Sequence, residues 1–178
     1  MVRKLYGNDW VELRELVLPE KGVNGYSYLH EKRCDGDIVS ILPYKTDAEG
    51  NLTEIMVRQE ITPCWSMKEA MSSITGGVEK KNGKQDILGT AVMELREEGG
   101  LKAPASALKE LGTCRGTKSS DTLYHLYTVD FDDAEEVEAS GDGSKLEAMA
   151  RCVWVKPEDL KKAQDPLLPM LFMRLVMK

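Results

Sequence analysis

The stretch that decides the fold runs from residue 76 to residue 101 and reads GGVEKKNGKQDILGTAVMELREEGGL. Asp86 stands where a side chain can accept the free amide hydrogens of a first helical turn. Four apolar residues then recur at helical spacing and form one face, namely Leu88, Ala91, Val92 and Leu95. Gly99-Gly100 ends the pattern, because glycine readily adopts the left-handed conformation that closes many helices. We therefore expect a helix between Asp86 and Gly99.

Three glutamates crowd together on a different face of this predicted helix. Glu94, Glu97 and Glu98 are three and four residues apart, so their side chains are neighbours. Like charges at this spacing destabilise a helix by about 0.2–0.5 kcal/mol per pair, and the helix dipole disfavours negative charge at the C-terminal end. A hard divalent cation would offset both effects, because Mg²⁺ prefers oxygen ligands and is commonly held by one or two carboxylates. A solvated acidic helix face is the other interpretation of the same residues.

The stretch resembles a Nudix box. The family pattern is a glycine, five residues, a glutamate, seven residues, Arg-Glu, an aliphatic residue, any residue, Glu-Glu, any residue, a glycine and an aliphatic residue. Its second half matches residues 94–101, and the upstream glycines match Gly76-Gly77 with a small insertion at residues 81–83. Two positions depart from the pattern, because Met93 replaces the arginine and Gln85, or Lys84, replaces the first glutamate. The arginine normally fixes the carboxylates by charge-assisted hydrogen bonds, whereas methionine can only pack.

The rest of the chain predicts a sheet with helices on both faces. Alternating or β-branched segments predict strands at residues 10–17, 26–30, 37–42, 52–58, 108–113, 122–129 and 152–155. One helix is expected from residue 156, with Pro157 in its first turn, and a second helix is expected over residues 166–177. The sum is an α/β fold, a Nudix-type α/β/α sandwich with a mixed sheet. Residues 1–36 would form a short N-terminal β extension and residues 37–178 a single globular Nudix domain.

The order of segments is most similar to the ADP-ribose pyrophosphatase group of the Nudix family. This resemblance implies a metal-dependent hydrolase that cleaves the diphosphate linkage of nucleoside diphosphate derivatives such as ADP-ribose or nucleotide sugars. Mg²⁺, or Mn²⁺ in its place, would be the cofactor, held by Glu94, Glu97, Glu98 and the backbone carbonyl of Gly77. In related enzymes a later loop brings a further glutamate to the substrate, and Glu147 is the candidate here.

Three residues are candidates for contacts with the substrate. Arg58 is the arginine of a Val-Arg-Gln segment at the end of its predicted strand, which resembles that of the ADP-ribose pyrophosphatases, and it would face phosphate or ribose unless it is an exposed strand-end arginine. Trp65 could stack on a base, a contact worth about 1–3 kcal/mol, or pack in the core. Ser120 belongs to a Ser-Ser-Asp loop that also matches the group's layout.

Two other functions fit the sequence less directly. Met93 and Gln85 favour a degenerate Nudix domain that binds nucleotides as a sensor or regulatory module and has lost turnover. The acidic run of residues 132–138 is the one feature that would suit a scaffold for a protein partner, and a solvated charge run explains it equally well.

Composition narrows the class of partner. A net charge of −6 and a pI near 5.1 argue against a nucleic-acid backbone or an anionic membrane, because both attract basic surfaces. The four cysteines are scattered without metal-ligand spacing, which argues against a zinc site and favours reduced thiols in a cytoplasm. The first ten residues lack the apolar core of a signal peptide, and no apolar run reaches the length of a membrane span. The N-terminal extension suggests a homodimer by resemblance, with an ordinary intramolecular sheet as the alternative.

Overall fold

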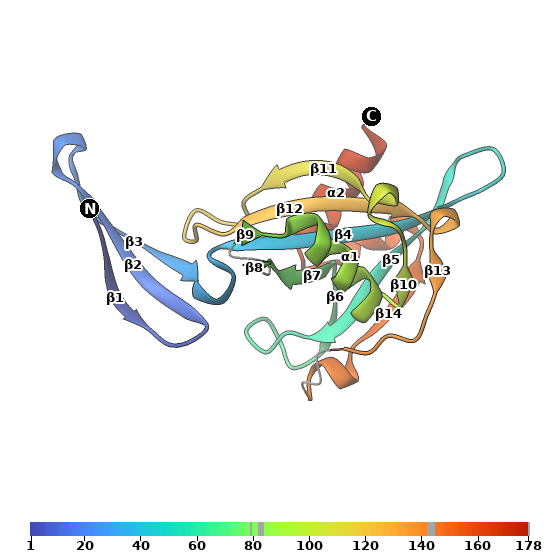
Figure 1. The fold of residues 1–178 in the computed structure, drawn as a ribbon, viewed down its shortest axis with the longest axis horizontal. Coiled ribbons are helices and arrows are strands. Elements are labelled where there is room, and N and C mark those ends of the chain that lie inside the picture. The colour runs from blue at the N-terminus through green and yellow to red at the C-terminus, as the bar shows by residue number, and fades with distance from the viewer. Residues whose placement is uncertain (79, 82–83, 142–144, 178) are drawn as a thin grey trace.

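A seven-stranded mixed sheet forms the centre of the computed structural model (Figure 1). The model describes residues 1–78, 80–81, 84–141 and 145–177, with the backbone alone at Lys81 and Glu147. The strand order is β11 (Lys109–Cys114), β12 (Leu123–Asp130), β4 (Asp37–Thr46), β5 (Leu52–Ile61) and β14 (Arg151–Val155). Strand β6 (Glu69–Ser72) pairs with β5, and β7 (Ile74–Gly77) pairs with β4. The sheet is mixed because β12 and β4 run parallel while their other neighbours are antiparallel.

The central strands are apolar on both faces of the sheet. Successive side chains of a strand point to opposite faces, so Val39 and Ile41 of β4 enter one core cluster while Leu42 enters the other. Met56 of β5 likewise joins the first cluster, and its neighbour Val57 joins the second. A strand buried on both sides reads as a nearly continuous hydrophobic run, which is how these segments read in the sequence.

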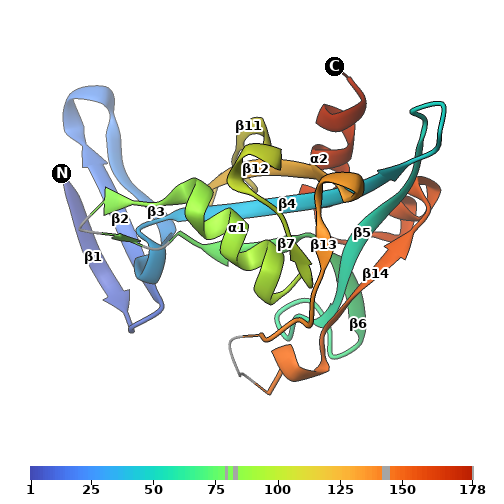
Figure 2. The same ribbon diagram turned by 45° about the vertical axis from the view of Figure 1, so that its right-hand side comes forward.

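Helix α1 (Ile87–Glu97) covers one face of this sheet, over β4 and β7 (Figure 2). The predicted cap is confirmed, because the Asp86 carboxylate accepts a hydrogen bond from the Gly89 amide at 3.1 Å. Ala91 and Leu95 are fully buried, as expected. The predicted apolar face was wrong at Leu88, which is 39% exposed, because the buried stripe of the helix instead passes through Thr90.

Helix α2 (Leu167–Val176) covers the opposite face and buries Leu168 and Leu171 completely (Figure 1). The α/β/α arrangement expected from the sequence is therefore confirmed. The segment after Lys156 forms a 3₁₀ helix over Pro157–Lys162 rather than an α-helix. Within the described residues no helix has the length and apolar character needed to cross a bilayer.

The first 31 residues form a separate antiparallel sheet at one end of the molecule (Figure 1). Its strands are β1 (Val2–Gly7), β2 (Val11–Leu18) and β3 (Val23–Glu31). The second and third were expected, and the first was not. Two short two-stranded antiparallel sheets complete the strands, β8 (Lys80–Lys81) with β9 (Lys84–Gln85) and β10 (Leu101–Lys102) with β13 (Glu135–Glu136).

Backbone contacts tie this N-terminal sheet to the loop between β11 and β12. The Leu29 amide donates to the Ser119 carbonyl at 2.8 Å, and the Asp121 amide donates to the Leu29 carbonyl at 3.2 Å. His30, 3% exposed, places its Nδ1 atom 3.0 Å from the Asp121 carboxylate. The extension is thus joined to its own main sheet within one chain.

A buried carboxylate connects α2 to the edge of the main sheet. Asp165 is 4% exposed and precedes α2 directly. One oxygen accepts hydrogen bonds from the Ser73 amide at 2.8 Å and the Ser73 hydroxyl at 2.9 Å, and the other accepts from the Leu167 amide at 2.8 Å. Ser73 lies between β6 and β7. The Asp165 side chain therefore fixes the point where the chain passes from β6, which pairs with β5, to β7, which pairs with β4.

We expect Asp165→Ala to lower the free energy of unfolding by about 3 kcal/mol, because it leaves two buried amides and a buried hydroxyl without their charged acceptor. Asp159→Ala is the matched control, because it removes a partly exposed ion pair with Lys162 that should contribute less than about 1 kcal/mol. Urea unfolding followed by circular dichroism measures both changes. Equal losses in the two variants would contradict this account of Asp165.

Candidate active site

The predicted glutamate cluster lies at the C-terminal end of α1. Glu94 and Glu97 belong to the helix, whereas Glu98 is its C-cap, with its amide donating to the Glu94 carbonyl at 2.9 Å. All three side chains are half-buried. Gly100 follows in the left-handed conformation at φ 64°, so the expected glycine stop is confirmed.

Glu94 lies directly over the backbone of β7. A Cβ atom placed on Gly76 would stand 1.8 Å from the nearer Glu94 carboxylate oxygen, so only glycine leaves room for this side chain. Gly77, the residue expected to offer a carbonyl to a metal ion, lies one residue further along the same strand. A Cβ there would meet Cys34 at 3.0 Å instead of a glutamate. The close approach between helix and strand therefore occurs at Gly76.

Glu98 is held by an arginine from the sheet. Its Oε2 atom lies 3.0 Å from the Nη1 atom of Arg58 on β5, and the two side chains are only 12% and 6% exposed. The Nε atom of the same guanidinium donates to the Glu60 carboxylate at 3.0 Å. Glu60 in turn accepts a hydrogen bond from the Ser72 hydroxyl at 2.7 Å. Arg58 is therefore not an exposed strand-end arginine. It is buried at the helix end, between the carboxylates of Glu60 and Glu98.

A small cavity opens where Arg58 meets the helix end. It has a volume of about 190 Å³, and its charged lining residues are Arg58, Glu97 and Glu98. The rest of the lining is small, from Ala139, Ser140, Gly141, Ala148 and Ala150. The Gly141 amide donates to the Glu97 carbonyl at 3.0 Å, which attaches this loop to the end of α1. Small side chains leave room beside the carboxylates, as a phosphate-sized ligand would require.

Glu147, the fourth predicted catalytic residue, begins the 3₁₀ turn Glu147–Met149 next to this loop. Its side chain lies outside the described residues, so its role stays a prediction. The same holds for the insertion expected at residues 81–83, most of which falls outside the described ranges.

Cys152 lies beside Arg58 and contacts the end of α1. It pairs with Arg58 across β14 and β5, and its thiol donates to the Glu98 carbonyl at 3.3 Å. Burial raises the pKa of this thiol to about 12, and the nearby Glu98 carboxylate acts in the same direction while Arg58 opposes it. The thiol therefore stays protonated near neutral pH and offers no thiolate to a metal ion or substrate.

Trp65 lines a second cavity of about 450 Å³ and is 46% exposed, so the alternative of core packing was wrong. Thr62, Thr75 and Tyr124 are among the other lining residues. Glu60 also lines this cavity while its ion-pair partner Arg58 lines the smaller one. The two cavities therefore meet at one ion pair, with Trp65 on the wall of one and Glu97 and Glu98 on the wall of the other.

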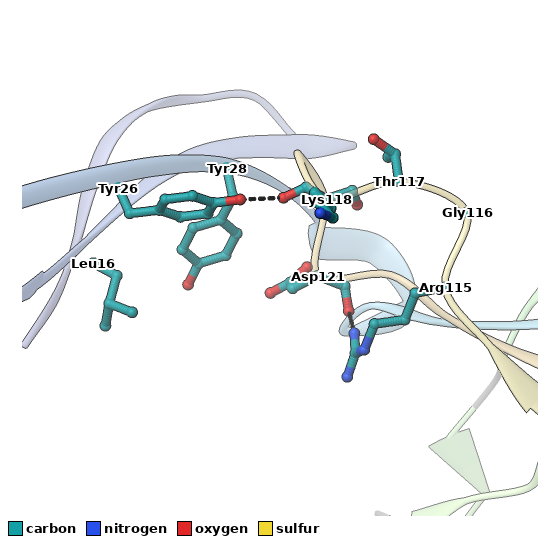
Figure 3. A pocket seen from close by; sticks show the side chains of 9 residues that line it. Leu16, Tyr26, Tyr28, Arg115, Gly116, Thr117, Lys118 and Asp121 are labelled. Atoms are coloured by element: carbon teal, nitrogen blue, oxygen red, sulfur yellow. Dashed lines mark hydrogen bonds between the residues drawn. The ribbon is translucent and has the colours of Figure 1, made fainter. Parts of the chain in front are cut away.

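Ser120 lies elsewhere, in a cavity of about 610 Å³ between the N-terminal sheet and the loop before β12 (Figure 3). Its hydroxyl is 2.6 Å from that of Thr122. Tyr26 and Tyr28 approach this cavity from β3, and Tyr26 donates to the Lys118 carbonyl at 2.5 Å. Gly116 and Thr117 line both this cavity and the one at Trp65, so the two adjoin. Ser120 is not brought to the glutamates.

Gln85, which stands near the family's first glutamate, is engaged at the start of β4. Its side-chain amide donates to the Asp37 carboxylate at 2.6 Å, and Asp37 also lies 2.7 Å from His125 on β12. Met93, which stands at the arginine position, is half-buried on α1. Neither residue supplies a charge to the glutamates.

The carboxylate oxygens at this site suit a hard cation, although the described residues contain no preformed cluster of metal ligands. Among the described residues, no group of three His, Cys, Asp or Glu side chains is close enough to hold a metal ion. Mg²⁺ does not require such a group, because it usually keeps several waters and binds one or two carboxylates together with substrate phosphates. Glu97 and Glu98 share a cavity and Glu94 lies one turn earlier, so oxygen ligands are available in that arrangement.

Three residues of this site were missed by sequence reasoning. Glu60 lies two positions after Arg58 on the same strand and so on the same face, which the sequence could have indicated. Ser72 and Cys152 reach the site as cross-strand neighbours of Arg58. That register depends on which strands pair, so no local signal identifies them.

Comparisons with known proteins support the fold. No family model and no curated protein sequence matches the chain. Among solved structures, one titled "Crystal structure of ADP compounds hydrolase" is similar with a TM-score of 0.69 at 12% sequence identity, over 98% of this chain and 89% of that one. Identity this low shows the fold alone. The Nudix-type α/β/α sandwich with a mixed sheet, predicted from the sequence, is therefore confirmed as the architecture of this chain.

Proposed function

We propose that the chain is a metal-dependent hydrolase that cleaves the diphosphate linkage of nucleoside diphosphate derivatives such as ADP-ribose or nucleotide sugars. The observation that carries the proposal is the cavity lined by Glu97, Glu98 and the buried Arg58, next to the cavity of Trp65. The similar fold of a hydrolase of ADP compounds supports the same substrate class. The substrate would be a small nucleotide, with no role for nucleic acid or a membrane.

The glutamates and Trp65 have different roles in the proposed reaction. Glu94, Glu97 and Glu98 would hold Mg²⁺ or Mn²⁺, which when bound neutralises diphosphate charge and makes water a better nucleophile near neutral pH. Glu97, on the cavity wall, can accept the proton of the attacking water. Attack at one phosphorus breaks its bond to the bridging oxygen, so each product carries one phosphate. Trp65 offers a face on which the base can stack.

A nucleotide-binding module without turnover is the second candidate. The engagement of Gln85 with Asp37 favours it, because the residue near the family's first glutamate is used in a structural contact. The two candidates differ in turnover, while both require nucleotide binding.

We expect the purified protein with Mg²⁺ to convert ADP-ribose or a nucleotide sugar into two phosphomonoesters, which phosphatase treatment then degrades to inorganic phosphate. Glu97→Gln and Glu98→Gln should each lower kcat/KM at least about 100-fold, because removing a metal ligand costs two or more units of 1.36 kcal/mol in transition-state stabilisation. Glu158→Gln, at an exposed position of the 3₁₀ helix Pro157–Lys162, is the matched control and should behave as wild type. Tight nucleotide binding without any product would support the module instead.

Metal binding should also appear without substrate. A cation that binds only the folded chain stabilises it by about 2.7 kcal/mol at 100 times its dissociation constant, so Mn²⁺ should raise the melting temperature and EDTA should reverse the rise. The Glu98→Gln variant should show a smaller rise. A melting temperature that does not respond to millimolar Mn²⁺ or Mg²⁺ would count against the metal site.

Gly76→Ala tests the placement of Glu94. The added methyl would occupy the space of the Glu94 carboxylate, 1.8 Å from its oxygen, so that side chain must move away. We expect weaker Mn²⁺ binding and a lower melting temperature, with stability partly recovered when Glu94→Ala removes the clashing atoms in the same protein. Measurements by calorimetry on wild type, both single variants and the double variant decide this. A Gly76→Ala protein as stable as wild type, with unchanged Mn²⁺ affinity, would show that Glu94 does not lie on this strand.

A further inference from the structure

We propose that Arg58 supplies the cation that positions Glu98, at a helix end where position 93 carries methionine. The inference rests on the proposed function, because it gives Glu98 the role of a metal ligand. It makes Arg58 a positioning residue of the sheet and not a residue that touches the substrate.

The contacts of Arg58 are those of a fixed support. Its guanidinium is bound on two sides, by Glu98 through Nη1 at 3.0 Å and by Glu60 through Nε at 3.0 Å. The whole residue is 5% exposed. Salt screens buried pairs much less than exposed ones, and the planar guanidinium fork loses little freedom when it bonds carboxylates. Glu98 is therefore held in one orientation by a side chain that is itself held.

The sheet makes this support rigid. Arg58 lies on β5 with Cys152 of β14 on one side and Ser72 of β6 on the other. The Ser72 hydroxyl also donates to Glu60, which keeps the second carboxylate in place beside Arg58. Glu98, by contrast, is the C-cap residue and lies beyond the last regular turn of α1. An arginine anchored in the sheet therefore orients a carboxylate at the end of the helix.

The ion pair leaves Glu98 able to bind a cation. Arg58 contacts one carboxylate oxygen, Oε2. An ionised carboxylate has two oxygens and about four lone-pair positions, so the contact with Arg58 does not by itself prevent Glu98 from also ligating a metal ion in the cavity that it shares with Glu97. Partners of metal ligands act in this way in other proteins, where they set the orientation of the ligand and the affinity for the metal.

The test places the arginine on either element and measures Mn²⁺ binding without nucleotide, from the electron paramagnetic resonance signal of free Mn²⁺. Four variants are compared with wild type: Arg58→Met, Arg58→Lys, Met93→Arg and the double variant Arg58→Met with Met93→Arg. We expect Arg58→Met to weaken Mn²⁺ binding about 10-fold or more, the usual effect of losing such a partner. Met93→Arg alone should change little, and in the double variant it should recover only a part of the lost affinity, because position 93 lies one turn from Glu97 and not from Glu98.

Arg58→Lys keeps the buried positive charge but lacks the fork that bonds two carboxylates, so it should weaken binding to an intermediate degree. It also serves if Arg58→Met does not fold, which melting in EDTA reveals. Arg151→Met is the matched control, because this exposed arginine on the neighbouring strand pairs with Glu69. It should bind Mn²⁺ as wild type does.

Three results would overturn the proposal. Arg58→Met and Arg58→Lys could both bind Mn²⁺ as well as wild type, or more tightly, which would mean that Arg58 has no positioning role or competes with the metal for Glu98. Arg151→Met could weaken binding as much as Arg58→Met, which would indicate a general charge effect. Wild type could bind no Mn²⁺ at all, which would remove the metal from the proposed function as well. The first two outcomes leave the proposed function intact.

Discussion

The close approach of α1 to β7 at Gly76 is the constraint on which the site depends. The Glu94 carboxylate occupies the volume that a side chain on Gly76 would fill, so the helix lies against the strand at this point. Leu95, the next residue of the helix, is fully buried in the core beneath it. Burial of an apolar side chain of this size contributes about 1.5–3 kcal/mol. The packing that stabilises the fold therefore also sets the position of the acidic helix end.

The other wall of the site comes from sequence-distant segments that the sheet brings to this helix end. Arg58 arrives on β5, Cys152 on β14, and the Gly141 amide from the loop after β13. Each contacts a different atom of the last helical turn or its cap: the Glu98 carboxylate, the Glu98 carbonyl and the Glu97 carbonyl. The terminal carbonyls of a helix have no partners within the helix, so these contacts satisfy them and anchor the site at the same time.

The sequence was informative wherever a signal is local. The Asp86 cap, the glycine stop, the acidic face and the strands that correspond to β4 and β5 follow from neighbouring residues, and the structure confirms them. The sequence was uninformative about partners that meet across strands. The contact between Arg58 and Glu98 could not be predicted, because which residue faces the helix end depends on strand order and register, and the expected contact of Arg58 with substrate stays a prediction. Leu88 shows the same limit for a helix, since a rotation of one position decides which residues face the sheet.

The absence of an arginine at position 93 has a different consequence once the contacts between helix and sheet are considered. Within the helix sequence alone, Met93 leaves three glutamates without a cation, which argues for a degenerate site. In the structure, Arg58 lies between Glu60 and Glu98, and Glu97 lines the same small cavity as Arg58 and Glu98. Carboxylates still outnumber cations within this group of four side chains, and a buried excess of negative charge is costly in the absence of a compensating cation. The arrangement thus keeps Glu98 oriented beside Glu97 in a cavity whose lining is acidic overall, where a divalent cation would offset the excess charge as the proposed function requires.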